Sequence, residues 1–284
     1  MILLDLSQVM IATLMISLGK HTNAEVDESM LRHMIINSLR MNHHKFSREY
    51  GPLIICADDT NYWRKDIFPY YKAGRKDARK ESEIDWNVVF KSLNRIKAEI
   101  KEFLPYKVIQ SDRAEADDVI GTIARNEGTL LNSEDKILIL SGDKDYIQLQ
   151  KFANVSQYDP TRKKFITHND PAAYLHEHIL RGDRGDGIPN VLSADNSFVD
   201  GIRQKQLRAT KIAKWDSGEV PIDQETQRNI ARNRALIDLS EVPGSIKVDI
   251  LRQWDEPNTK TRAQLVSYFM KYKLKHLMEH IGEF

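Results

Sequence analysis

The sequence has almost no cysteine, no long apolar run and almost no net charge. Its 284 residues include one cysteine, Cys56, so an intramolecular disulfide and a Cys-rich zinc site are excluded. No apolar stretch approaches the roughly 20 residues of a membrane-spanning helix, and the start, MILLDLSQ, lacks the basic segment of a signal peptide. With 42 basic and 41 acidic residues, the chain is neither a basic coat protein nor an acidic disordered tail. We expect a cytoplasmic protein without membrane contact.

Several catalytic motifs are missing as well. The sequence contains no GxSxG, GxxxxGK[ST] or GxGxxG, so a serine hydrolase and a nucleotide-cradling loop are unsupported. The histidine spacing does not indicate a metal site. His176 and His178 are two apart and should point to different faces of a helix, while His276 and His280 lack a third ligand. We expect these histidines to be exposed residues without a metal ion.

Short apolar runs alternate with helical patterns in the first 170 residues. We expect strands at Ile2–Leu4, Leu53–Cys56, Lys107–Ile109 and Lys136–Leu140, and helices at 25–48, 86–103 and 115–125. Beyond about residue 170 the strand signals fade, and helices are expected at 171–180, 198–214, 224–238, 244–254 and 259–281. This alternation predicts an α/β fold with a parallel sheet, followed by a helical C-terminal region.

Acidic residues follow all four predicted strands. In chain order they are Asp5, Asp58 with Asp59, Glu115 with Asp117 and Asp118, and Asp143 with Asp145. Each acid alone could be a helix cap or a turn residue. Together they should converge, because the carboxyl ends of parallel strands share one edge of the sheet. Converging carboxylates raise one another's pKa, and bound Mg²⁺ would remove that cost.

Two basic segments lie at 61–81 and 201–216. The first holds Arg64, Lys65, Lys72, Arg75, Lys76, Arg79 and Lys80, and the second holds Arg203, Lys205, Arg208, Lys211 and Lys214. Such segments attract phosphate backbones, although a solvated helix face is the simpler interpretation of each. The helical spacing of Lys205, Arg208 and Lys211 would suit duplex DNA. The nearby aromatics Tyr62, Trp63, Tyr70 and Tyr71 could stack on bases or pack in the core.

The segment LRGDRGDGIPNV, residues 180–191, joins two predicted helices. Its two Gly-Asp pairs and its proline predict a tight turn between the helices. Exposed backbone groups at helix ends can hold a phosphate or a cation, but the segment could also be a simple loop with helix caps.

In chain order, WRKDIFPYYKAGRK, AEADDVIG, LSGDKDYIQL and LRGDRGDGIPNV resemble the motifs of the flap endonuclease (5′ nuclease) family, and the resemblance covers nearly the whole chain. It implies a PIN-like α/β nuclease domain over residues 1–170, with a helical arch at about 61–85. A helical DNA-binding region containing a helix-three-turn-helix would follow over residues 171–284.

The resemblance also implies functional residues. The metal-site acids would be Asp5, Asp58, Glu115, Asp117, Asp118, Asp143, Asp145 and Asp186, with Asp183 farther from the ions. They would hold two Mg²⁺ ions, for which Mn²⁺ could substitute. Lys72 and Arg75 would contact the scissile phosphate, while Arg64, Lys65, Lys76 and Arg79 would guide single-stranded DNA. A K⁺ ion would bind the helix-three-turn-helix, where Gly187 replaces the family's usual Asn and Asn190 stands where Gly is common.

The implied activity is hydrolysis of phosphodiesters near the 5′ ends of DNA and RNA–DNA duplexes. It combines 5′-to-3′ exonuclease, ribonuclease H and flap endonuclease activity, and it would remove RNA primers during phage DNA replication in the host cytoplasm. The expected partners are DNA with a 5′ flap, nick or fork, RNA–DNA hybrid, and a single-strand-binding protein or sliding clamp. We expect a monomer. Two alternatives stay open: a structure-specific DNA-binding protein with an inactive site, and a PIN-type endoribonuclease.

Overall fold

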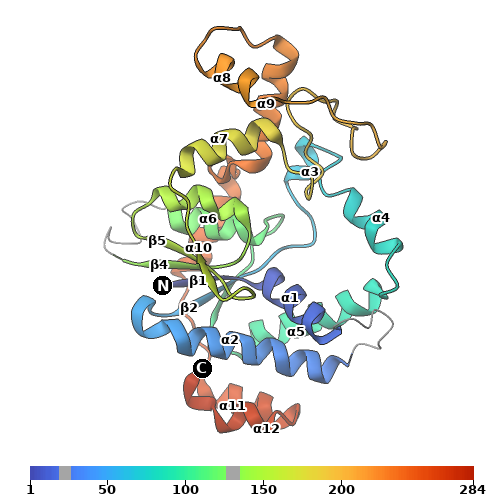
Figure 1. Cartoon of the computed structure of the whole chain (residues 1–284). Helices are drawn as coiled ribbons and strands as arrows, with labels where there is room; N and C mark the ends of the chain where they lie inside the picture. Colours follow the sequence, from blue (N-terminus) through green and yellow to red (C-terminus); the bar gives the residue numbers. More distant parts are fainter. Residues whose placement is uncertain (19–26, 126–134) are drawn as a thin grey trace.

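The structure is a computed structural model that describes residues 1–18, 27–125 and 135–284, with the backbone alone at 76–78 (Figure 1). A six-stranded sheet with the order β3-β2-β1-β4-β5-β6 lies at its centre. The strands are β1 (Ile2–Asp5), β2 (Leu53–Cys56), β3 (Lys107–Ile109), β4 (Ile137–Leu140), β5 (Val155–Asp159) and β6 (Lys164–Ile166). Only the β5–β6 pairing is antiparallel among these strands, so the carboxyl ends of β1 to β5 share one edge.

Helices cover both faces of this sheet. The helices before residue 126 are α1 (Leu6–Leu18), α2 (Glu28–Tyr50), α3 (Arg64–Ile67), α4 (Gly74–Lys80), α5 (Trp86–Phe103) and α6 (Ala116–Arg125). Those after residue 134 are the 3₁₀ helix η1 (Lys144–Lys151), α7 (Pro171–Arg181), α8 (Ala209–Asp216), α9 (Gln224–Ile237), η2 (Leu239–Glu241), α10 (Gly244–Asp255), α11 (Arg262–Lys271), α12 (Lys275–Glu279) and η3 (Ile281–Glu283).

The period of two along each strand divides the core into two layers. Ile2 and Leu4 of β1 pack with α1, α2 and α5, whereas Leu3 packs with α6 on the opposite face. The central strands β1, β2 and β4 are buried on both faces, so they are almost entirely apolar, as is typical of a parallel sheet. Figure 1 shows α2 and α5 on one side of the sheet and α6 and α10 on the other.

The C-terminal helices complete both layers. Ile246 and Ile250 of α10 join the layer of α6, while Leu265 and Phe269 of α11 join the layer of α2 and α5. A buried polar cluster fastens α11 in place: Glu99 of α5 accepts hydrogen bonds from Arg32 Nε at 2.7 Å and Tyr268 Oη at 2.8 Å. The helices α10, α11 and α12 therefore share their core with the sheet, whereas α7, α8 and α9 pack in two smaller clusters.

The local sequence patterns predicted many of these elements. The ranges predicted for β2, β3 and α5 are confirmed, and α7, α9 and α10 lie within one residue of prediction at each end. The prediction of one helix over 259–281 is wrong: α11 ends at Lys271, and Lys273 has a positive φ of 56° before α12 begins. We did not predict α1, β5 or β6.

The helix predicted at 198–214 is also wrong over most of its length, because α8 begins only at Ala209. The backbone ahead of it is bonded to the segment after α7. Asn190 N donates to Gln204 Oε1 at 2.7 Å, Asn190 Nδ2 donates to the Lys205 carbonyl at 2.8 Å, and Lys205 N donates to Ser193 Oγ at 3.0 Å. These contacts replace the hydrogen bonds of a helix.

Among the described helices, none is both long enough and apolar enough to cross a lipid bilayer.

Candidate active site

Five of the predicted acids line one cleft at the carboxyl edge of the sheet. They are Asp5, Asp58, Glu115, Asp117 and Asp143. Asp5 ends β1 and Asp58 follows β2, the two EADD acids lie at the start of α6, and Asp143 follows β4. The cleft has a volume of about 490 Å³, and Lys72 and Arg75 lie along it as well. The convergence expected from strand order is therefore present in the fold.

The cleft is electrostatically unfavourable for its own carboxylates. Burial, and then the nearby carboxylates of Asp58 and Asp143, raise the pKa of Asp5 to about 7. Burial and the neighbouring Asp145 raise the pKa of Asp143 to about 6. Among the described residues no hydrogen-bond donor reaches the buried Asp117 Oδ1, and Arg64 Nη1 lies 3.7 Å from it. Divalent cations would satisfy this oxygen and relieve the repulsion, so the donor set fits them.

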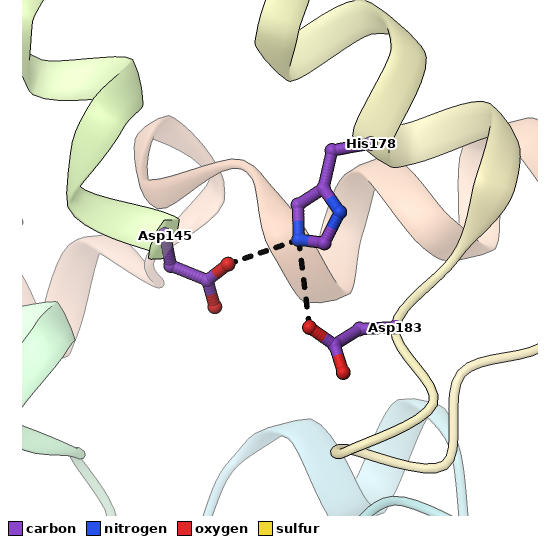
Figure 2. A group of neighbouring side chains, drawn as sticks. All are labelled: Asp145, His178 and Asp183. Carbon is purple, nitrogen blue, oxygen red and sulfur yellow. Dashed lines mark hydrogen bonds and ion pairs between the residues drawn. The ribbon is translucent and has the colours of Figure 1, made fainter. Parts of the chain in front are cut away.

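A second group of possible ligands lies beside the cleft. His178 of α7 points between Asp145 of η1 and Asp183, which follows α7 (Figure 2). Its Nε2 lies 2.9 Å from Asp145 Oδ1 and 3.6 Å from Asp183 Oδ2. The expectation that His178 is exposed is wrong, because α7 packs on η1 and leaves its side chain only 15% exposed. His176 points to the other face and contacts Asp216, as its spacing predicted.

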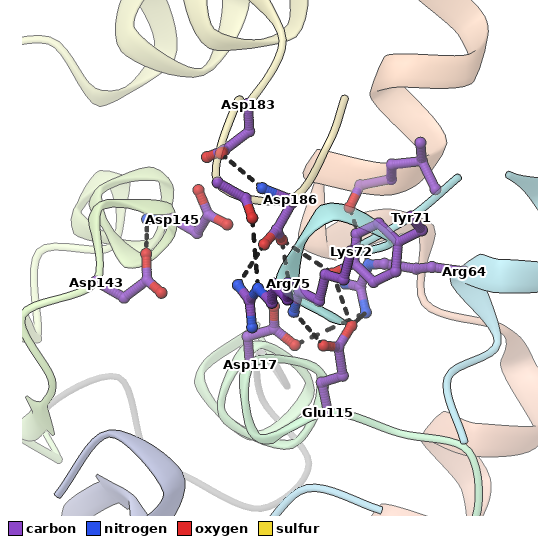
Figure 3. A network of polar contacts seen from close by, with 12 residues as sticks. Arg64, Tyr71, Lys72, Arg75, Glu115, Asp117, Asp143, Asp145, Asp183 and Asp186 are labelled. Atoms are coloured by element: carbon purple, nitrogen blue, oxygen red, sulfur yellow. Dashed lines mark hydrogen bonds and ion pairs between the residues drawn. The ribbon is translucent and has the colours of Figure 1, made fainter. Parts of the chain in front are cut away.

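Lys72 and Arg75 are held by the acids (Figure 3). Lys72 Nζ forms an ion pair with Glu115 and lies 3.5 Å from Asp186 Oδ2, while Arg75 Nη2 lies 2.5 Å from Asp186 Oδ1. The backbone is fixed too: Lys72 has a positive φ of 57°, and its N–H donates to the Asp186 carbonyl at 2.8 Å. Burial lowers the pKa of Lys72, but Asp186 and Glu115 outweigh it and raise the pKa overall.

Tyr71 adds a contact that the sequence pattern did not indicate. Its hydroxyl lies 2.8 Å from Glu115 Oε2 and 3.0 Å from Asp186 Oδ2. Tyr71 and Trp63 are buried, so of the four aromatics named for stacking these two belong to the core. Tyr62 lines the cleft, and base stacking stays a prediction for it.

Arg64 and Asp118 form a buried pair behind the cleft. Arg64 is 1% exposed, lies 2.8 Å from Asp118 Oδ1 through Nη2, and donates to the Leu236 carbonyl through Nε at 2.9 Å. The prediction that Arg64 guides DNA is wrong, because a buried guanidinium cannot reach a phosphate backbone. Asp118 does not line the cleft, although it has an oxygen within 4.8 Å of Glu115 and Asp117 oxygens. A metal contact of Asp118 stays a prediction.

The other predicted DNA contacts lie on the surface. Lys65 and Arg79 are exposed and lie over the rings of Tyr62 and Phe90, whereas the Lys76 side chain is outside the described part of the chain. The side chains predicted to share a helix face are exposed too, namely Lys205, Arg208 and Lys211. The prediction of one helix face is wrong for them, since only Lys211 lies within α8.

Comparison with known proteins identifies the family. Residues 6–177 match the N-terminal resolvase-like domain of the 5′-3′ exonucleases, and residues 171–284 match the C-terminal domain of T4 ribonuclease H. The chain is 31% identical over 297 residues to ribonuclease H of Enterobacteria phage T4, covering 99% of this chain and 95% of that protein. The chain belongs to the 5′-3′ exonuclease family. It is a 5′ nuclease with the mostly parallel α/β fold that the motifs predicted.

Other relatives match in part or in fold. Flap endonuclease Xni of Shewanella woodyi is 32% identical over 155 residues, which cover 52% of this 5′ nuclease and 56% of the relative. Among solved structures, the bacteriophage T5 D15 flap endonuclease with DNA and metal ions shares the fold, with a TM-score of 0.59 and 18% identity over 90% of this chain and 99% of that one. The zinc-bound T5 5′-exonuclease does so with a TM-score of 0.56 and 17% identity over 96% and 97%.

Proposed function

We propose that this 5′ nuclease hydrolyses phosphodiesters near the 5′ ends of DNA and RNA–DNA hybrids at the cleft on the carboxyl edge of the sheet. The observation that supports this best is the juxtaposition of five acids with Lys72 and Arg75 in one cleft. Carboxylates and fixed cations in contact suit a reaction in which charge develops on phosphate oxygens.

We assign two Mg²⁺ ions to the acids, with Mn²⁺ as a substitute. Asp5, Asp58, Glu115, Asp117 and Asp143 would hold one ion directly or through water, and Asp145, Asp183 and Asp186 would hold the other. When bound, such a pair of ions polarises the phosphate and lowers the pKa of an attacking water. The protein contributes a fixed set of oxygens: Asp5 Oδ1 accepts the Gln8 N–H at 3.0 Å, and Asp58 Oδ1 accepts the Ala116 N–H at 2.6 Å.

Lys72 and Arg75 would contact the scissile phosphate. In the protein alone they neutralise Glu115 and Asp186. Once cations neutralise these carboxylates, the two basic side chains can turn to the phosphate oxygens, which carry more charge in the transition state. Tyr71 and the positive-φ backbone at Lys72 keep both residues at the rim of the cleft.

We assign the segment around α3 and α4, residues 61–85, to a single strand or 5′ end that enters the cleft. In Figure 1 this segment arcs along the side of the molecule between α3 and α5. Tyr62, Lys65 and Arg79 line that path in the proposal. Duplex DNA would lie along the region 171–284, with Lys205, Arg208 and Lys211 on its backbone. The nuclease domain would be residues 1–170.

The proposed substrates are DNA with a 5′ flap, nick or fork and RNA primers on a DNA template, cleaved by a monomer in the cytoplasm. Docking of a single-strand-binding protein or sliding clamp stays a prediction without assigned residues. K⁺ binding at residues 180–191 also stays a prediction. The carbonyls of Asp183, Arg184 and Pro189 already accept hydrogen bonds, which leaves fewer lone pairs for an ion.

The test is cleavage of 5′-labelled flap DNA, nicked duplex, RNA–DNA hybrid and free RNA, each with Mg²⁺ and with EDTA. We expect Mg²⁺-dependent products near the 5′ end of the first three substrates. Asp117→Asn should abolish them, because it removes a carboxylate that faces the cleft. Cleavage of free RNA alone would favour the endoribonuclease alternative, and tight flap binding without cleavage would favour an inactive DNA-binding protein.

A further inference from the structure

Asp145, His178 and Asp183 bring three ligand atoms from three separate elements to one point (Figure 2). Asp145 lies in η1, His178 in α7, and Asp183 in the loop that follows α7. The three atoms, two carboxylate oxygens and an imidazole nitrogen, lie within 4.8 Å of one another. Unlike the five acids that line the cleft, this group contains a nitrogen donor.

The spacing matches the bite of one metal ion. Two ligands at about 2.1 Å from an ion, at angles of 90–110°, lie about 3.0–3.4 Å apart. His178 Nε2 lies 2.9 Å from Asp145 Oδ1 and 3.6 Å from Asp183 Oδ2, on either side of that range. An ion could enter between the three atoms with small side-chain rotations.

The loop and its neighbours fix these ligands in advance. Gly182 has a φ of +71° and turns the chain back after α7, so that Asp183 faces His178. Asp183 Oδ1 accepts the Asp186 N–H at 3.1 Å, which leaves Oδ2 directed at the imidazole. The ring of Tyr174, one turn earlier on α7, packs beside His178 with a centroid separation of 5.7 Å. A preorganised ligand set costs little entropy when an ion binds.

The donor set selects among ions. Mg²⁺ is a hard cation that takes oxygen ligands in near-ideal octahedral geometry. Mn²⁺ also suits carboxylate oxygens, but as a first-row transition ion it accepts an imidazole nitrogen more readily than Mg²⁺ does. We infer that Asp145, His178 and Asp183 form a mixed nitrogen and oxygen site that accepts a transition ion such as Mn²⁺ in preference to Mg²⁺. The inference rests on the proposed function, since it makes this group the second of the two cation positions and gives the two positions different metal preferences.

The rival interpretation is an imidazole that only orients Asp145 by a hydrogen bond. Such a positioning residue would not touch the ion, so its loss would weaken Mn²⁺ and Mg²⁺ alike. A direct ligand makes a different prediction: its loss weakens Mn²⁺ much more than Mg²⁺, and the bound Mn²⁺ carries the magnetic signature of a nitrogen nucleus.

The experiment uses the full chain with Mn²⁺ or Mg²⁺ as the only ligand. Electron spin echo modulation of bound Mn²⁺ detects a coordinated ¹⁴N, and calorimetric titration gives the affinity for each ion. We compare the wild type, His178→Gln, and the matched control His176→Gln, whose imidazole faces Asp216 on the opposite side of α7. We expect nitrogen modulation in the wild type and the control and none in His178→Gln, with a loss of Mn²⁺ affinity of about tenfold or more and nearly unchanged Mg²⁺ affinity.

Two results would overturn the inference: no nitrogen modulation in the wild type at saturating Mn²⁺, or equal losses for both ions in His178→Gln. If His178→Gln fails to fold, Asp183→Asn decides the matter, because it should weaken Mn²⁺ binding while the nitrogen modulation persists. Mg²⁺-dependent flap cleavage is measured on the same wild-type protein. Cleavage without nitrogen modulation would overturn this inference but not the proposed function. The absence of cleavage would overturn the proposed function, whatever the Mn²⁺ measurements show.

Discussion

Lys72 shows how a single side chain can serve two sets of partners. In the protein alone its ammonium group neutralises Glu115 and Asp186, and its backbone N–H holds the Asp186 carbonyl. A scissile phosphate would offer the same ammonium group a new partner whose charge grows in the transition state. Its replacement should therefore affect the rate constant and not only the affinity.

Lys72→Ala should lower single-turnover cleavage of 5′-flap DNA at saturating enzyme by at least about tenfold, since one preorganised contact is typically worth on the order of 100-fold or more. Arg75→Ala should behave similarly, because both residues share Asp186. Lys80→Ala, on the same basic segment but outside the cleft lining, is the control and should at most weaken binding. Full rescue of Lys72→Ala by more enzyme would reduce its role to DNA binding.

Asp143 is the acid that best separates chemistry from DNA binding. Asp143→Asn should lower cleavage by orders of magnitude at saturating Mg²⁺, because the cleft loses a charged ligand. Its affinity for flap DNA should be unchanged or higher, since a carboxylate that repels phosphate is gone. Fluorescence anisotropy and single-turnover kinetics measure the two effects, with the exposed Asp112→Asn as the control. Near-normal turnover in Asp143→Asn would contradict the two-cation assignment.

At the scale of elements, the loop after α7 depends on one glycine. A Cβ at Gly182 would lie 2.3 Å from the Ile188 carbonyl oxygen and 2.5 Å from that of Pro189, and the φ of +71° is strained for any other residue. Gly218, at a φ of +72°, has open space around the same position and provides a matched control.

Gly182→Ala should therefore lower the free energy of unfolding by about 2 kcal/mol or more beyond the roughly 1 kcal/mol expected for Gly218→Ala, where only the backbone conformation is unfavourable. Urea denaturation of both variants measures the difference. Equal losses would show that the loop relaxes around the added methyl group.

The start of α8 carries two of the basic residues that we assign to duplex DNA. Arg208 and Lys211 line the same surface hollow and are exposed. Replacing both with Ala should weaken duplex binding and lower the log–log salt slope by about 0.9 for each lost phosphate contact. Single-turnover cleavage at saturating enzyme should change little. An unchanged salt slope would show that these residues do not contact phosphates and are ordinary solvated surface residues.

At the scale of the whole molecule, the acidic cleft makes stability depend on pH and metal. The folded-state pKa values of Asp5, about 7, and Asp143, about 6, lie above the usual value near 3.8. The protonated acids therefore favour the fold. Their stabilising contribution is complete below about pH 4 and is lost as the pH rises through 6 to 7.

In EDTA, we expect Asp5→Asn to stabilise the protein relative to the wild type at pH 8, by on the order of 1–3 kcal/mol, and to have little effect at pH 4.5. With saturating Mg²⁺ at pH 8, the wild type should instead be more stable than Asp5→Asn, because the variant lacks one metal ligand. Denaturant unfolding at the two pH values measures both effects. A pH-independent difference between the proteins would show that Asp5 is ionised throughout this range.

The sequence predicts this molecule well where local patterns decide the structure. The α5 helix has apolar residues on one face, a capping aspartate at Asp85 and a proline beyond its end, and its limits were predicted correctly. The α1 helix carries apolar residues on nearly all sides, including the exposed Met15 and Ile16, so no periodic signal marks it. The strand ends predicted which acids converge, because sheet topology follows from the element order.

Contacts between residues far apart in the sequence could not be predicted from local patterns. Arg64 is buried because Asp118 and the Leu236 carbonyl surround it, and these partners are far away in the sequence. His178 lies near the acids because α7 packs on η1, which no local pattern indicates. Its position five residues before Asp183, near the end of a helix that leads into an acidic turn, was the one available signal.

The pairing of β1 has a consequence for how the chain folds during synthesis. Leu3 lies beside Ile54 of β2 on one side and Ile139 of β4 on the other, so the central strand stays half paired until almost half of the protein has been made. Both faces of the sheet stay incompletely covered longer still, since residues of α10 and α11 complete them. Contacts this distant in sequence make folding slow and leave apolar strands unprotected on the ribosome. A nascent chain halted before α10 should therefore be protease-sensitive and depend on chaperones, although every acid of the cleft is already present.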